Sequence, residues 1–157
     1  MRSVLLLALL TVALVGAQED PAISSISNTT TTFFQLFELP CTSWASLFEK
    51  DAVFYHPNVP EGVRGISGLI KFCEGAQSAK GVQQFRQDGH MRITKSGQHY
   101  HALVEYVYSV VKDNGRLFTN SGWENLIFSY KNGATTIKEV TEYFNRNSLP
   151  YTWDPSS

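Results

Sequence analysis

The apolar residues of this chain recur at helical spacing in its first half and alternate in its second half. Over residues 33–50 they repeat every three to four positions, and Pro40 interrupts them, which predicts two short helices or one kinked helix. Helical spacing returns at 66–76 and predicts a third helix. Between these segments, residues 52–56 form a short β-type run that stops at Pro57.

Beyond Gln84 the apolar pattern has a period of two, which is typical of strands. Two Asn-Gly pairs, at 114–115 and 132–133, are strong signals for two-residue hairpin turns. Helices followed by a run of hairpin-linked strands indicate an α+β fold with an antiparallel sheet. The strands are expected at about 84–94, 99–111, 116–130 and 135–145.

If both Asn-Gly pairs form two-residue turns, Glu105 lies opposite Glu124, and Thr141 lies on the other side of Glu124. A bulge would change this register, and Gly122 is a candidate bulge site. Because side chains alternate between faces, two sets result. The first set is His101, Leu103, Glu105, Glu124, Leu126, Phe128, Thr141, Tyr143 and Asn145. The second set is Tyr100, Val104, Tyr106, Tyr108, Trp123, Asn125, Val140, Glu142 and Phe144.

The N-terminus has the pattern of a cleaved secretory signal. Arg2 precedes the apolar run 4–15, and small residues follow at Gly16 and Ala17. A membrane anchor is the alternative, although the run is shorter than the roughly 20 residues of a membrane span. We expect a signal peptide at 1–17, a polar Ser/Thr-rich leader at 18–32, the folded domain at 33–147 and a C-terminal tail at 148–157. The protein would then be secreted, with a glycosylation sequon at Asn28.

Cysteine content and charge narrow the class of protein further. Cys41 and Cys73 are the only cysteines, and in an oxidising compartment such a pair indicates a disulfide, with two buried free thiols as the alternative. The formal net charge is −1, and the basic residues do not cluster. The sequence therefore argues against a partner that is nucleic acid or anionic lipid.

Three stretches resemble SnoaL-like proteins of the nuclear transport factor 2-like superfamily. They are 48–57 (FEKDAVFYHP), the Arg64-Gly65 step into residues 66–72, and 123–145 (WENLIFSYKNGATTIKEVTEYFN), in this order. The resemblance implies a cone-shaped, cystatin-like roll, in which a curved sheet wraps around N-terminal helices and an apolar pocket. It also implies a homodimer formed through the sheet. The family includes polyketide cyclases, ketosteroid isomerase, scytalone dehydratase and limonene epoxide hydrolase besides non-catalytic binders, so the fold alone does not assign an activity.

In enzymes of this family a pocket acid often lies on the final strand, where this chain has Asn145. The resemblance therefore points to the first set as the pocket face. An amide cannot accept a proton as aspartate can, and Phe54 lacks the hydroxyl of the epoxide-hydrolase branch, which disfavours that activity. The ligand-binding residues expected on this basis are Phe54, His101, Leu103, Leu126, Phe128, Thr141, Tyr143 and Asn145.

The candidate catalytic residues are Glu105, Glu124 and His56. Two opposed carboxylates repel unless one is protonated or a cation neutralises them, and a dry pocket would separate their pKa values into an acid and a base. His56 ends the first strand and titrates near neutral pH, as a general base does. Solvated carboxylates and a structural histidine are the alternatives. His99 and His101 share a face but lack a third ligand, so we expect no metal and no cofactor.

These features favour a secreted protein that binds a small apolar molecule. The alternative is a cofactor-independent isomerase, cyclase, dehydratase or hydrolase that uses Glu/His acid–base chemistry, and the sequence leaves open whether the chain is an enzyme. A purely structural, dimerising module is a third interpretation. The expected partners are the small molecule and a second copy of the chain, without nucleic acid and without a membrane after signal cleavage.

Overall fold

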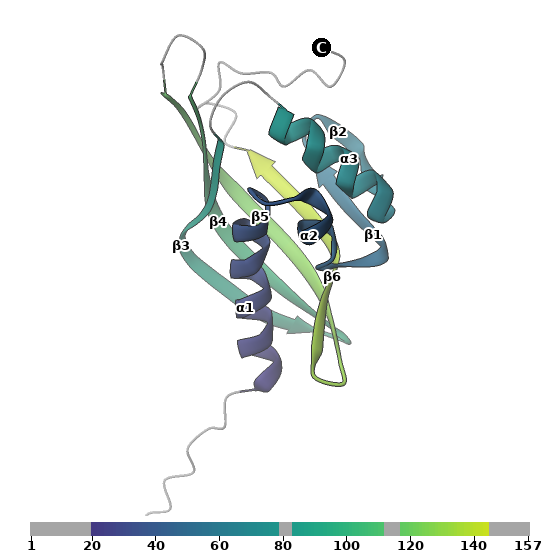
Figure 1. Cartoon of the computed structure of the whole chain (residues 1–157). Coiled ribbons are helices and arrows are strands. Elements are labelled where there is room, and N and C mark those ends of the chain that lie inside the picture. Colours follow the sequence, from purple (N-terminus) through teal and green to yellow (C-terminus); the bar gives the residue numbers. More distant parts are fainter. Residues whose placement is uncertain (1–19, 79–82, 112–116, 145–157) are drawn as a thin grey trace, which may run out of the picture.

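The computed structural model describes residues 20–78, 83–111 and 117–144. Within these ranges, helices pack against the inner face of a curved sheet, and α1 runs along that face (Figure 1). The helices are α1 (Pro21–Leu36), α2 (Cys41–Ala45) and α3 (Gly65–Ser78). The strands are β1 (Phe48–His56), β2 (Val59–Arg64), β3 (Gln83–Ser96), β4 (His99–Val111), β5 (Leu117–Lys131) and β6 (Ala134–Phe144). The α+β class expected from the sequence is confirmed.

The strands follow the order β2-β1-β6-β5-β4-β3 across the sheet. Strands β1 and β6 run parallel, whereas the other neighbouring pairs are antiparallel. The sheet is therefore mixed, and the expectation of a wholly antiparallel sheet is wrong at this pair. Strand β2 was not expected, because it contains Pro60. It lies at the edge of the sheet, where a missing backbone N–H is tolerated.

Helix α1 begins inside the segment expected to be a polar leader. The Asp20 side chain caps the helix by accepting a hydrogen bond from the backbone N–H of Ala22 at 3.0 Å, and Pro21 occupies the first turn. Threonine hydroxyls donate to carbonyls four residues earlier, as Thr30 does to Ile26 at 2.8 Å, so these polar side chains are satisfied within the helix. Most of the Ser/Thr-rich segment is therefore part of the packed fold, which corrects the expected boundary.

The register between β4 and β5 differs by one residue from the expected one. Val104 pairs with Glu124, and Glu105 pairs with Trp123. The expected pairing assumed a two-residue turn at 114–115, which lies outside the described residues. A shift of one residue moves a strand's side chains to the opposite face.

The hairpin between β5 and β6 starts as expected and then shifts. Asn132 and Gly133 have φ values of 54° and 82°, as a type I′ turn requires, which confirms this turn. A β-bulge follows between the pairs Phe128–Ile137 and Ile127–Glu139, so the extra residue lies in β6 and not at Gly122. As a result Glu124 pairs with Glu142 and not with Thr141. The two shifts lie on either side of β5, so β5 turns its expected residues toward the inside, whereas β4 and β6 turn inward the residues that were expected on the outer face.

The disulfide between Cys41 and Cys73 is present and joins α2 to α3. The bridge spans a sequence separation of 32 residues, which corresponds to about 3–4 kcal/mol of stabilisation by chain entropy. Both cysteines are buried in the same core as the aromatic residues of α1. Among the described residues, none of the helices has the length and apolar character needed to span a membrane.

Candidate functional site

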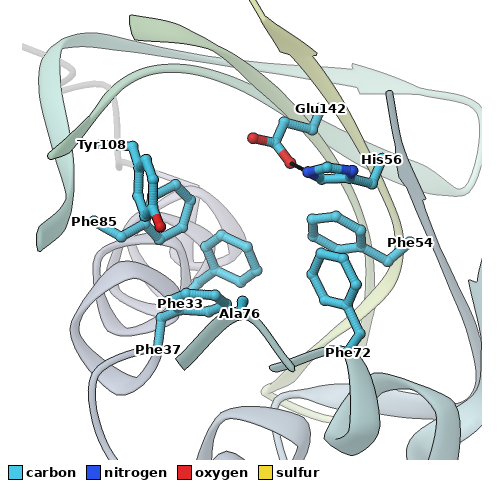
Figure 2. A pocket seen from close by; sticks show the side chains of 9 residues that line it. All are labelled: Phe33, Phe37, Phe54, His56, Phe72, Ala76, Phe85, Tyr108 and Glu142. Atoms are coloured by element: carbon cyan, nitrogen blue, oxygen red, sulfur yellow. Dashed lines mark ion pairs between the residues drawn. The ribbon is translucent and has the colours of Figure 1, made fainter. Parts of the chain in front are cut away.

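A pocket opens between the helices and the inner face of the sheet (Figure 2). The pocket has a volume of about 80 Å³. The empty space is about 450 Å³ when the open mouth is included. Its walls come from α1 and the residue after it, from α3, and from strands β1, β3, β4 and β6. The lining residues are Phe33, Phe37, Phe54, His56, Phe72, Ala76, Phe85, Tyr108 and Glu142.

Aromatic rings in mutual contact form most of the pocket wall. On one side, Phe54 of β1 and Phe72 of α3 have ring centroids 4.9 Å apart. On the other side, Phe85 of β3 lies 5.0 Å from the Phe37 ring and 6.4 Å from the Tyr108 ring. Such ring pairs stabilise one another beyond simple burial and hold the wall in a defined shape. The helices and the sheet thus border a space whose walls are mostly apolar.

One side of the pocket carries polar side chains from neighbouring strands. Tyr55 of β1 pairs with Thr141 of β6, so the next residues, His56 and Glu142, are neighbours on the inner face. Glu124 of β5 pairs with Glu142 and continues the row. In Figure 2 the carboxylate of Glu142 points toward the imidazole of His56.

The hydrogen bonds of His56 determine which ring nitrogen carries its proton. The backbone N–H of Asn58 donates to His56 Nδ1 at 3.1 Å, so Nδ1 is unprotonated and the proton of the neutral ring lies on Nε2. Nε2 lies 3.5 Å from Glu142 Oε2. Burial lowers the pKa of His56 from 6.5 to about 4, so the ring is neutral at pH 7 and this contact is not a salt bridge at that pH.

Tyr106 reaches Glu142 across strand β5. Its hydroxyl donates to Glu142 Oε1 at 2.6 Å, although Tyr106 belongs to β4 and Glu142 to β6. The phenol passes over Gly122, which is the partner of Tyr106 in the register of β5. A Cβ atom at Gly122 would lie 2.7 Å from the Tyr106 hydroxyl and would overlap the carbonyl oxygen of Tyr143. The missing side chain at Gly122 therefore makes this hydrogen bond possible.

The two inner carboxyl groups have raised pKa values. Burial raises the pKa of Glu142 to about 7, and the hydrogen bond from Tyr106 partly offsets this rise. Burial, and then the charge of Glu142, raise the pKa of Glu124 well above its ordinary value. Burial and the two nearby carboxylates also raise the pKa of Tyr106, which keeps its proton. Tyr106 therefore keeps its proton at neutral pH, and the coupled pair of Glu124 and Glu142 holds protons more tightly than exposed carboxyl groups do.

The expected pair of Glu105 and Glu124 does not form. Glu105 pairs with Trp123 on the outer face, whereas Glu124 is fully buried on the inner face. The reason is the register of β4 and β5, which places these two side chains on opposite sides of the sheet. The carboxyl that lies beside Glu124 is Glu142, which the sequence had placed on the opposite face.

The expected ligand-binding residues divide into four groups. Phe54 lines the pocket, as does the candidate base His56. Leu126 and Phe128 are fully buried on the inner face and belong to the core beside the pocket. Asn145 lies outside the described residues. The remaining four lie on the outer face, which corrects their assignment to the pocket: His101, Leu103, Thr141 and Tyr143.

Sequence reasoning missed the most important polar residues of the site, Glu142 and Tyr106. A usable signal was present in β4, where Tyr100, Ala102, Val104 and Tyr106 share one face and His101 and Glu105 lie on the other. These four side chains are buried, and they identify the inner face of the strand without any assumption about turns. Comparing the two faces of β4 would therefore have placed Tyr106 on the inner face.

The outer face of the sheet has a separate, shallower groove. It has a volume of about 440 Å³ and is lined by Arg92, Thr94, Ser96, His101, Leu103 and Asn125. Across the described part of the chain, His, Cys, Asp and Glu residues do not gather in groups of three or more that could hold a metal ion. The aromatic pocket with its polar row is therefore the site that combines enclosure with titratable groups.

Known protein families and curated proteins show no match to this sequence. Among solved structures, Aln2 from a Streptomyces species is similar, with a TM-score of 0.68 and 8% identity over 82% of this chain and 93% of that chain. A nuclear transport factor 2-like superfamily protein from Salmonella enterica serovar Typhimurium has a TM-score of 0.66 and 17% identity, over 83% and 96%. A protein from Catenulispora acidiphila in complex with S-DNPA has a TM-score of 0.67 and 12% identity, over 80% and 95%. These similarities confirm the nuclear transport factor 2-like, SnoaL-like fold that the sequence motifs imply.

Proposed function

We propose that this chain binds a small, largely apolar molecule in the pocket between α1, α3 and the sheet. The observation that carries the proposal is the pocket wall, which includes six aromatic side chains and has His56 and Glu142 next to one another on one side. Ligand sites typically combine such an apolar lining with a few convergent polar groups. The fold of a protein that is in complex with S-DNPA supports the same conclusion.

Filling the pocket tests this proposal without removing a polar group. Ala76→Leu adds three carbon atoms from α3 into the pocket, and Lys71→Leu adds a leucine at an exposed position of the same helix as a control. Small apolar molecules should raise the melting temperature of the wild type and of Lys71→Leu, but not of Ala76→Leu. Equal stabilisation of the two variants, or no stabilisation of the wild type, would refute binding at this pocket.

A second candidate function is acid–base catalysis on the bound molecule, as in an isomerase, cyclase, dehydratase or hydrolase. The specific observation in its favour is Glu142, whose pKa of about 7 is suited to a general base at neutral pH. Its carboxylate accepts the hydrogen bond of Tyr106 and faces the Nε2–H of His56, so both groups would orient it toward a substrate.

Proton transfer can be tested without knowing the natural substrate. A bound ligand with an acidic C–H group is incubated with the protein in D₂O, and deuterium incorporation is followed by mass spectrometry. Wild type should exchange the proton, whereas Glu142→Gln should bind the ligand without exchanging it. Exchange at the same rate in Glu142→Gln would remove Glu142 from the role of base.

We also propose that the protein is secreted, glycosylated at Asn28 and dimeric through the outer face of the sheet. The disulfide supports an oxidising compartment, and Asn28 is exposed on α1. On the outer face, Leu103, Trp123 and Tyr143 are 40%, 42% and 53% exposed, which is unusual for large apolar side chains. Mass spectrometry of the secreted protein tests processing and glycosylation. Sedimentation of Trp123→Glu tests the interface, and a wild type that sediments as a monomer would refute it.

A further inference from the structure

The two inner carboxyl groups lack a positively charged partner. Among the described residues, neither Glu124 nor Glu142 contacts a lysine or arginine, and the one basic side chain beside them is His56. Glu124 is 0% exposed, and neither of its carboxyl oxygens has a hydrogen-bond partner. Buried polar groups of native proteins are nearly always paired, so an unpaired carboxyl beside a second carboxyl calls for an explanation.

His56 does not supply the missing charge. Its Nδ1 accepts the Asn58 N–H, and burial lowers the pKa of the ring to about 4, so the ring is neutral at physiological pH. The protein thus places two acidic groups side by side with a neutral imidazole. Opposed carboxylates on a sheet repel one another unless a proton or a cation intervenes.

The other walls of the same pocket are suited to a cation. Phe33, Phe37, Phe54, Phe72, Phe85 and Tyr108 surround the space next to Glu142. The faces of aromatic rings attract alkylammonium groups, and the attraction is stronger where water is excluded. An aromatic enclosure with a carboxylate on one side therefore matches an organic ammonium ion better than a neutral hydrocarbon.

We propose that the ligand of this pocket is a small organic cation, a protonated alkylamine whose ammonium group lies against Glu142 and whose apolar part contacts the aromatic wall. This inference rests on the proposed binding function and specifies its ligand class. Glu142 keeps acceptor capacity for the ammonium group, because Tyr106 engages Oε1 and His56 faces Oε2, while a carboxylate offers about four lone-pair sites. The volume of about 80 Å³ suits a short, branched amine whose substituents extend toward the mouth.

Binding of a cation would also change the protonation of the site. In the free protein Glu142 is partly protonated near neutral pH, since burial raises its pKa to about 7. An ammonium ion stabilises the ionised form, so Glu142 releases its proton as the cation enters. Affinity for the amine should therefore rise with pH until the amine itself deprotonates, which for alkylamines occurs near pH 10.4.

Isobutylamine and isobutanol provide a matched pair of probes. They share one carbon skeleton, and the first has a charged ammonium group where the second has a neutral hydroxyl. Their dissociation constants are measured by NMR titration at constant ionic strength. Isobutylamine should bind about tenfold or more tightly than isobutanol at pH 8, and its affinity should rise about tenfold or more between pH 5.5 and 8. The affinity for isobutanol should stay constant to within about twofold.

Two variants locate the effect. Glu142→Gln should weaken isobutylamine binding about tenfold or more and leave isobutanol binding within about twofold. Glu139→Gln changes a carboxyl on the other face of the same strand, since Glu139 pairs with Ile127, and it should leave both affinities unchanged. Circular dichroism and the retained binding of isobutanol show that each variant is folded.

The outcomes separate the ligand class from the binding function. If both probes bind equally well, or if Glu142→Gln leaves isobutylamine affinity unchanged, the cation proposal is wrong and the proposal of an apolar pocket stands. If neither probe binds to the wild type, both proposals fail. Preferential binding of isobutylamine that Glu142→Gln abolishes and Glu139→Gln preserves establishes the cation site.

Discussion

Two residues of the pocket should affect stability with opposite dependence on pH. Glu142 has a pKa of about 7 in the folded protein against an ordinary value of 4.5, because its charged form is buried. At about 1.4 kcal/mol for each pH unit, folding loses about 3 kcal/mol from this group as pH rises from 4.5 through 7. The stabilisation is fully present below pH 4.5, where Glu142 is protonated in both the folded and the unfolded chain.

His56 has the opposite effect over nearly the same range. Its pKa falls from 6.5 to about 4 on folding, so the unfolded chain binds the extra proton between these values. Folding therefore gains about 3 kcal/mol from His56 as pH rises from 4 to 6.5. The two contributions nearly cancel in the wild type, and each becomes visible when the other residue is replaced.

The assay is urea denaturation at several pH values between 4 and 8, with the disulfide intact. The unfolding free energy of Glu142→Gln minus that of the wild type should rise by about 3 kcal/mol from pH 4.5 to 8. For His56→Asn, which keeps an acceptor for the N–H of Asn58, the same difference should fall by about 3 kcal/mol from pH 4 to 7. Glu139→Gln controls for the change in net charge. If the unfolding free energies of both pocket variants change with pH in parallel with that of the wild type, the inferred pKa changes of Glu142 and His56 on folding are wrong.

Three further predictions concern interactions that stabilise the fold around the pocket. Tyr106→Phe should cost about 1.5–3 kcal/mol at pH 8, where Glu142 is ionised, and less at pH 5; equal losses in urea denaturation at both pH values would contradict this. Gly122→Ala should destabilise by about 2 kcal/mol or more, because the added Cβ would overlap the backbone carbonyl oxygen of Tyr143 and the Tyr106 ring, and an unchanged unfolding free energy in urea denaturation would contradict this. Reducing the Cys41–Cys73 bridge should lower the unfolding free energy by about 3–4 kcal/mol, whereas an unchanged denaturation midpoint would exclude this contribution.

Much of the architecture was predictable because it follows from local signals. The Asn132-Gly133 turn requires positive φ at both residues, and this pair adopts it more readily than almost any other. The prediction that Cys41 pairs with Cys73 needed only the count of two cysteines and the expectation of an oxidising compartment. The start of α1 was also readable, since Asp20-Pro21 is a helix-start signal, but the threonine-rich composition obscured the buried stripe that includes Ile26.

The candidate site was predictable only in part, because its composition depends on register. Phe54 and His56 reach the pocket from a strand whose local pattern indicated them. The neighbours of Glu124 depended on the register between β4 and β5 and on one bulge in β6, and each differs from the expected pairing by a single residue. No local property of Glu142 distinguishes it from a surface carboxyl, so its position inside followed from these long-range pairings alone.

The fold class, the disulfide and the resemblance to a known fold could be read from the chain, because periodicity, turn chemistry and ordered motifs act over short distances along it. The inner carboxyl pair of Glu124 and Glu142, and the hydrogen bond that Tyr106 adds across Gly122, became evident only from the pairing of the strands in the folded protein. Each strand takes its register from the strand beside it. One extra residue in a connection or bulge therefore changes which side chains share the enclosed face.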